Sequence, residues 1–181
     1  MKTPQIVELT STDIDQYIDK LCTILHANVH DGASVNFIVP FSFDDAKNYW
    51  KNKIQSSIEK QERTLWAAFE GDNLAGSVQL DYSMPPNQNH RCEVSKLIVH
   101  PDFRRRGIAR KLMAQIEDKA RELKRQLITL DTVKGSKAEP LYLSLGFEIA
   151  GILPGFSRHP IENRFDATTY MYKNLAAKFD G

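Results

Sequence analysis

This sequence of 181 residues lacks the features that mark several protein classes. Its two cysteines, Cys22 and Cys92, fit neither a metal-ligand spacing nor a disulfide framework, so we expect buried thiols in a reducing compartment. No apolar run approaches the roughly 20 residues of a membrane span, and the amino terminus lacks the apolar core of a secretory signal. We therefore expect a cytoplasmic protein with no membrane partner and no metal.

An excess of charge of one sign is also missing. Lysine and arginine number 24, aspartate and glutamate 23, and the net charge is +1. A nonspecific nucleic-acid binder carries a strong basic excess, so no nucleic-acid partner is expected. The hydrophobic fraction of 41% and the charged fraction of 26% are ordinary for a globular protein, and the length fits one domain over residues 1–181.

Hydrophobic periodicity predicts a mixed α/β domain. Thr12 and Asp15 form the expected capping box of the first helix, and Pro154 to Arg164 is expected to be a long loop. The predicted order is β-α-α-β-β-β-α-β-α-β-β, with strands at residues 5–9, 64–70, 74–82, 92–99, 127–133, 147–153 and 168–173, and helices at about 12–29, 42–60, 108–123 and 138–145.

The most informative segment joins an apolar strand to an amphipathic helix through an arginine-rich turn. Arg104, Arg105 and Arg106 precede Gly107, and the helix follows from Ile108. Such a turn presents several backbone N–H groups and the positive end of a helix dipole at one point, which suits a phosphate or pyrophosphate. Gly107 keeps side chains out of the way of the ligand. The segment predicts a phosphorylated cofactor, and the plainer alternative is a solvated turn.

The run Arg-Arg-Arg-Gly-Ile-Ala at 104–109 fits the (Gln/Arg)-x-x-Gly-x-(Gly/Ala) pattern of the GNAT superfamily of N-acetyltransferases, which this chain resembles. The resemblance implies a single-domain GNAT fold, with a mixed, mostly antiparallel sheet of about seven strands flanked by about four helices. It also implies acetyl-CoA as cofactor and CoA as product. The pyrophosphate would lie on the amides of residues 105–110, and the pantetheine arm along 97–99. The cofactor-binding residues implied are Leu97, Ile98, Val99, Arg104, Arg105, Arg106, Gly107, Ile108, Ala109, Arg110, Ser136 and Tyr142.

A second stretch, from Ala138 to Phe147, resembles the other signature of the superfamily, in which a tyrosine faces the cofactor sulfur. Tyr142 matches that tyrosine. A phenol with a pKa of about 10 stays protonated near neutrality and can donate to a thiolate, whose thiol has a pKa of roughly 8.5. We predict Tyr142 as the general acid, with an aromatic core residue as the alternative. Many relatives have an asparagine seven residues before this tyrosine. This chain has Gly135 at that position, followed by Ser136.

Two acidic residues are candidates for the proton acceptor. Glu93 and Asp131 lie on strands expected to diverge around a cleft, where either can take the proton of the substrate amine, directly or through water. The alternative is an ordinary salt bridge for each. His30 and Asp31 begin a loop that borders the acceptor pocket in this superfamily. They are predicted as substrate contacts, with polar surface as the alternative.

Patches at 30–35, 93–97, 130–132 with 135–136, and 153–155 resemble the tabtoxin-resistance acetyltransferases of the superfamily. This implies a small-molecule amine as substrate, for instance a β-lactam dipeptide toxin, attacked directly in a ternary complex with Glu93, Asp131 and Tyr142 as catalytic residues. Two alternatives stay open: an acceptor on a protein lysine or amino terminus, and a noncatalytic CoA-binding module. Both a monomer and a homodimer are compatible with the sequence.

Overall fold

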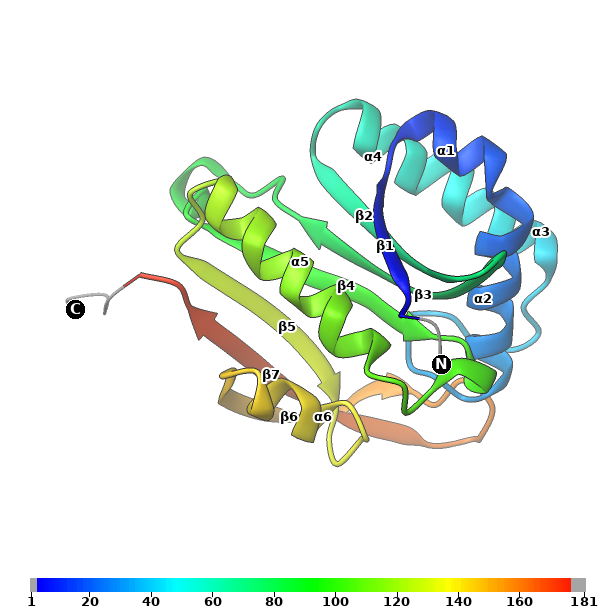
Figure 1. Cartoon of the computed structure of the whole chain (residues 1–181). Coiled ribbons are helices and arrows are strands. Elements are labelled where there is room, and N and C mark those ends of the chain that lie inside the picture. The colour runs from blue at the N-terminus through cyan, green and yellow to red at the C-terminus, as the bar shows by residue number, and fades with distance from the viewer. Residues whose placement is uncertain (1–2, 177–181) are drawn as a thin grey trace.

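The computed structural model describes residues 3–176, which form a seven-stranded sheet with the order β1-β2-β3-β4-β5-β7-β6 (Figure 1). Strands β4 and β5 pair in parallel, and every other neighbouring pair is antiparallel. The predicted mixed, mostly antiparallel sheet is confirmed. The strands are β1 (Gln5–Leu9), β2 (Arg63–Glu70), β3 (Asn73–Asp81), β4 (Arg91–Val99), β5 (Leu127–Val133), β6 (Glu148–Arg158) and β7 (Phe165–Asn174).

Helices cover both faces of this sheet. On one side of β1–β3 lie the amino-terminal helices, and α5 crosses the opposite side (Figure 1). Each of the first two predicted helices is divided into shorter pieces. The helical elements are α1 (Ser11–Gln16), α2 (Ile18–His30), α3 (Phe43–Asn48), the π-helical segment η1 (Tyr49–Gln55), α4 (Ser56–Glu59), the 3-10 turns η2 (Pro86–Gln88) and η3 (Pro101–Phe103), α5 (Ile108–Glu122) and α6 (Glu139–Ser144).

The alternation of side chains along the central strands explains why two layers of helices are needed. In β2, Ala67 packs with α2 and Trp50 on one face, and the next residue, Ala68, packs with α5 on the other. Almost all of β3 is buried on both faces, so a helix layer must cover each side. Within residues 3–176 no helix is long and apolar enough to cross a membrane. The free thiols of Cys22 and Cys92 are buried, as expected.

The predicted first capping box is wrong by two residues. Thr10, and not Thr12, is the N-cap: its hydroxyl accepts from the Asp13 amide at 3.3 Å, and the Asp13 carboxylate accepts from the Thr10 amide at 2.8 Å. Asp15 instead accepts hydrogen bonds from Lys51 and Gln55 on η1. The helix therefore begins at Ser11, directly after the Thr10 cap, and is interrupted at Tyr17.

The predicted loop from Pro154 to Arg164 is partly wrong. Strand β6 continues through this region to Arg158, and only the residues after it form the connection to β7. Register is broken between Leu153 and Ser157, where Gly155 takes a left-handed φ of 61°. A bulge in the edge strand accommodates Pro154 and Gly155 without ending the strand.

Candidate active site

A split in the sheet creates the site. Strands β4 and β5 pair along three residues, from Arg91 and Leu127 to Glu93 and Thr129, and then separate. The separation leaves a cavity of about 260 Å³ with walls from six parts of the chain. Its lining residues are Ala33, Ser34, Val35, Asn36, Glu93, Val94, Ser95, Lys96, Leu97, Asp131, Thr132, Val133, Ser136, Ala138, Tyr142, Phe156, Ser157 and Thr168.

A bulge in β4 lies at the centre of this split. On β3, Gln79 pairs with Ser95 and Ser77 with Ile98, so two residues of β4, Lys96 and Leu97, stand opposite one of β3. On the other side, the main chain of β4 beyond Glu93 has no partner on β5. Apart from the Val99 carbonyl, which accepts from Arg104 Nε at 3.4 Å, the backbone groups of residues 97–99 on that side are therefore open to a strand-like ligand. This is the segment predicted to pair with the pantetheine arm.

The turn before α5 provides the second part of the site. Gly107 is the N-cap in a left-handed conformation, with φ of 75°, and a Cβ there would meet nothing within 4 Å. Arg105 is also left-handed, with φ of 65°. The amides of the first helical turn have no acceptor inside the helix, because the intrahelical bonds begin with Lys111 donating to the Gly107 carbonyl. These N–H groups and the helix dipole form an open anion-binding position.

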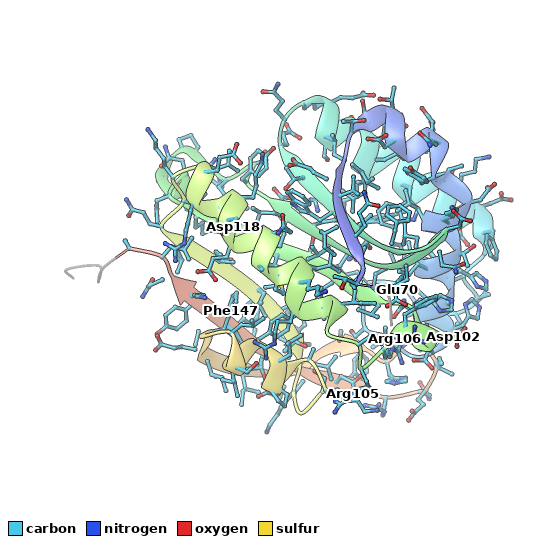
Figure 2. The ribbon with its side chains drawn as sticks, viewed as in Figure 1. Glu70, Asp102, Arg105, Arg106, Asp118 and Phe147 are labelled. Atoms are coloured by element: carbon cyan, nitrogen blue, oxygen red, sulfur yellow. The ribbon has the colours of Figure 1, made fainter. Side chains whose placement is uncertain are left out.

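The arginine side chains of this turn are largely held by other parts of the protein. Arg104 Nη1 lies 2.5 Å from the Asp31 carboxylate. Arg106 binds Glu70 at 2.8 Å and donates to the Asp102 carbonyl at 2.8 Å; Figure 2 shows these three residues together near the start of α5. Arg110 donates to the Ser144 hydroxyl at 2.7 Å. The side chains thus brace the turn, while its backbone amides stay open.

Tyr142 reaches the cavity from α6. Its side chain is 6% exposed and packs edge-on against Phe147, with ring centroids 5.8 Å apart. Burial raises the pKa of the Tyr142 phenol well above its ordinary value, and the nearby Asp131 carboxylate raises it further. In the described part of the chain, no hydrogen bond engages the Tyr142 hydroxyl. The phenol therefore keeps its proton and has it available for a ligand.

Both predicted carboxylates line the same cavity as Tyr142. Glu93 is about half exposed and has a long contact with Arg91, 3.4 Å from Nη1 to Oε2. Asp131 accepts from the Thr168 hydroxyl at 3.0 Å and stands opposite Tyr170 of β7. The structure thus brings Glu93, Asp131 and Tyr142 together, although they come from β4, β5 and α6.

His30 and Asp31 lie elsewhere. The His30 ring stacks on His26 with centroids 3.9 Å apart, its Nδ1 is 3.0 Å from the His26 carbonyl oxygen, and Asp31 binds Arg104. Neither residue lines the cavity, whereas the loop that follows them does, from Ala33 to Asn36. The roles predicted for His30 and Asp31 stay predictions. Ser136 does line the cavity, with its hydroxyl 3.1 Å from that of Thr132.

Sequence reasoning missed Lys96 as a site residue. The strand pattern treats it as an ordinary polar position, but the bulge holds it at φ of 51° and directs its ammonium towards the rings of Phe37 and Tyr49, 5.7 and 5.9 Å away. Burial lowers the pKa of Lys96 to about 8, and the charges of Lys53 and Arg63 lower it too, while Asp131 partly offsets them. A bulge that depends on pairing with β3 leaves no local signal in the sequence.

Phe156, Ser157 and Thr168 were also missed as cavity residues, because Phe156 and Ser157 fall in the region predicted as a loop. Within residues 3–176, no group of three or more histidine, cysteine, aspartate or glutamate side chains is arranged to hold a metal ion.

Comparison with known proteins gives a family and a fold. The family model described as "Acetyltransferase (GNAT) family" matches residues 28–147. An N-acetyltransferase from Staphylococcus aureus Mu50 superposes with a TM-score of 0.79 at 15% identity, over 97% of this chain and 100% of that one. The structure of yncA from Salmonella typhimurium, with its cofactor acetyl-CoA, gives 0.75 at 18% identity, over 99% and 98%. A ribosomal-protein-alanine N-acetyltransferase from Brucella melitensis gives 0.72 at 22% identity, over 94% and 99%.

Proposed function

Because this chain belongs to the acetyltransferase (GNAT) family and acts as an acetyl-CoA-dependent N-acetyltransferase, we propose that its acceptor is the amine of a small molecule. The observation that carries this proposal is the cavity of about 260 Å³ at the split between β4 and β5, bordered by Glu93, Asp131 and Tyr142. A concave site with a few convergent polar groups is typical of small-ligand binding. Two carboxylates at its wall attract a cationic amine.

The geometry fits acetyl-CoA. The open amides at the start of α5 suit its pyrophosphate, and the unpaired edge of β4 at residues 97–99 suits its pantetheine arm. Gly107 leaves the approach to those amides free of side chains. When bound there, acetyl-CoA supplies the acetyl group as a thioester.

The side chains of the cavity divide the proton transfers between them. Glu93 or Asp131 takes the proton from the acceptor ammonium, directly or through water, which leaves a neutral nitrogen as the nucleophile. Tyr142 Oη holds its own proton, because burial and Asp131 both raise its pKa, and can deliver it to the departing sulfur. This arrangement supports direct attack in a ternary complex, with no residue of the chain carrying the acetyl group.

A toxin or antibiotic with a free amine, such as a β-lactam dipeptide, is the acceptor type that the sequence patches at 30–35, 93–97, 130–132 with 135–136, and 153–155 favour. The first three of these patches line the cavity, with Ala33, Glu93, Lys96 and Asp131 among their lining residues. A role in resistance follows from such a substrate.

Thiol release from acetyl-CoA tests the proposal. The panel contains amino acids, a tabtoxin-type dipeptide, polyamines and aminoglycosides, beside peptides with a lysine or a free amino terminus. Turnover with a small amine, and at most slow turnover with peptides, is the expected result. Faster turnover with peptides would assign a protein acceptor instead. Saturable acetyl-CoA binding with no turnover across the panel would support the noncatalytic module.

A further inference from the structure

A second cavity adjoins the first through Lys96. It has a volume of about 550 Å³ and lies between the loop after α2 and the α3–η1 segment. Asn36 and Lys96 line both cavities. The aromatic residues Phe37, Phe41 and Tyr49 border the second one, so it offers apolar surface beside a cation. Lys96 therefore belongs to the walls of both cavities, with the carboxylates Glu93 and Asp131 in the first and the aromatic rings in the second.

Lys96 is a largely buried cation without a counterion. In the described part of the chain, its ammonium has no carboxylate within ion-pair distance, and its contacts are the faces of two aromatic rings. Its left-handed backbone is also unfavourable for a residue with a side chain. A buried charge normally has a partner, so the missing counterion indicates that the partner comes with a ligand.

The acidic groups around Lys96 are already engaged. Asp45, which lines the second cavity, accepts hydrogen bonds from the amide and the hydroxyl of Ser42 at 2.8 and 2.7 Å. Asp81 pairs with Arg63. Lys53 adds a further positive charge at the cavity wall. The opposite sign prevails at Glu93 and Asp131, so the two ends of the site favour opposite charges on one ligand.

We propose that Lys96 binds a carboxylate of the acceptor, which is therefore an amino-acid-like zwitterion. Its amine faces Glu93 and Asp131, its carboxylate meets Lys96, and its side chain extends into the aromatic second cavity. A contact between an ammonium and a carboxylate is a strong, charge-assisted interaction. This inference names the substrate class of the site described above and rests on the proposed function.

Matched pairs of acceptors test it by thiol release. The probes are L-methionine, L-phenylalanine, L-lysine and the dipeptide Ala-Ala, each compared with its C-terminal carboxamide. The wild-type enzyme is expected to favour the acid by at least about 10-fold in kcat/KM, because the amide leaves Lys96 unpaired. In Lys96→Gln this ratio should fall to about 1, whereas Lys60→Gln, on the exposed end of α4, should keep the wild-type ratio. No preference in the wild type, or the same preference in Lys96→Gln, would overturn the inference.

A readout independent of turnover separates this inference from the proposed function. NMR of ¹³C-labelled lysine, with the Lys96 signal identified by its absence in Lys96→Gln, follows the titration of this group. Binding of an acid probe should raise the pKa of Lys96 from its value of about 8 in the free protein, because an anion favours the charged form. The carboxamides should leave it unchanged. If no probe is acetylated but the acids still move this titration, the proposed function fails and the carboxylate site stands. An unmoved titration with every acid overturns the site.

Discussion

The two ends of the candidate site differ in how far their charges are satisfied. At the cofactor end, Arg104, Arg106 and Arg110 are held by Asp31, Glu70 and Ser144 before any ligand arrives. At the acceptor end, within residues 3–176, Glu93 has only a long contact with Arg91 and Lys96 has no carboxylate partner. At the cofactor end, side-chain contacts hold the backbone of the turn in place. At the acceptor end, charged side chains are left without a close protein partner and can pair with a ligand.

This difference assigns separate duties to the two ends. A turn held rigid by its side chains, with open amides, suits acetyl-CoA, which is the same ligand in every turnover. Preorganised donors lose little freedom on binding. Charged side chains without a protein partner in a cavity discriminate between ligands, because a wrong ligand leaves them unpaired. Substitutions at the cofactor end should therefore change ligand binding by altering the conformation of the turn. Those at the acceptor end should change it by removing a charge or a proton donor that meets the ligand.

The largest expected effect is that of Tyr142→Phe at the acceptor end. Removing the hydroxyl removes the proton donor, so turnover should fall by about 10²- to 10⁴-fold, which is typical of a lost general acid. Affinity for acetyl-CoA, measured by calorimetry, should change less than about 2-fold, because the open amides at the cofactor end are untouched. The ring keeps its packing against Phe147.

Tyr172→Phe is the matched control for that change. It also removes one phenol, whose hydroxyl donates to Glu148 at 3.1 Å on the exposed surface and not in the cavity. Its turnover should equal that of the wild type. Wild-type turnover in Tyr142→Phe would remove Tyr142 from the chemistry and with it the proposed division of proton transfers.

Gly76→Ala should disturb the cofactor end and the packing of α5 on the sheet. A Cβ at Gly76 would lie 2.7 Å from Ile108 Cγ2 and 3.2 Å from the Ile98 carbonyl oxygen, so α5 must move away from the sheet. Overpacking of this kind lowers the free energy of unfolding by about 1–3 kcal/mol. Urea denaturation measures the loss, and acetyl-CoA affinity should weaken with it. Gly151→Ala, whose Cβ would meet nothing within 4 Å, should have neither effect; equal stability of the two variants would contradict the packing argument.

The cofactor end could be predicted from the sequence because it is local. Its strand, arginine turn, Gly107 and amphipathic helix are consecutive, and each part follows from periodicity or backbone preference. The acceptor end is assembled from distant segments. The family resemblance predicted Glu93, Asp131 and Tyr142. The position of Lys96 depends on a bulge set by the register with β3. The position of Phe156 depends on a strand that continues through Pro154 and Gly155. The shift of the first helix cap reflects competition between nearby threonine–aspartate pairs, which tertiary contacts of Asp15 resolve.

Lys96→Met should produce a smaller, pH-dependent change in stability. Lys96 has a folded pKa of about 8 against 10.5 ordinarily, so between these values the unfolded chain binds more protons and the contribution of Lys96 to stability rises with pH. The variant lacks this rise, and at pH 7 it escapes the cost of a buried cation. Its melting temperature should exceed that of the wild type by several degrees at pH 7, a difference that shrinks towards pH 10. A constant difference across this range would show that packing, and not charge, is responsible.

The smallest expected effect decides whether Arg106 braces the turn or contacts the cofactor phosphates. If it braces the turn, Glu70→Gln and Arg106→Gln each remove the same ion pair, which for a partly exposed pair is worth about 0.2–1 kcal/mol, or at most about 5-fold in acetyl-CoA affinity. The double variant should then lose no more than Arg106→Gln alone, which also removes the hydrogen bond to the Asp102 carbonyl. Direct contact predicts opposite signs, because Arg106→Gln would remove a phosphate ligand while Glu70→Gln would remove a nearby negative charge and tighten binding. Calorimetric titration of the three variants at low and moderate salt therefore distinguishes a turn shaped by its side chains from one that binds through them.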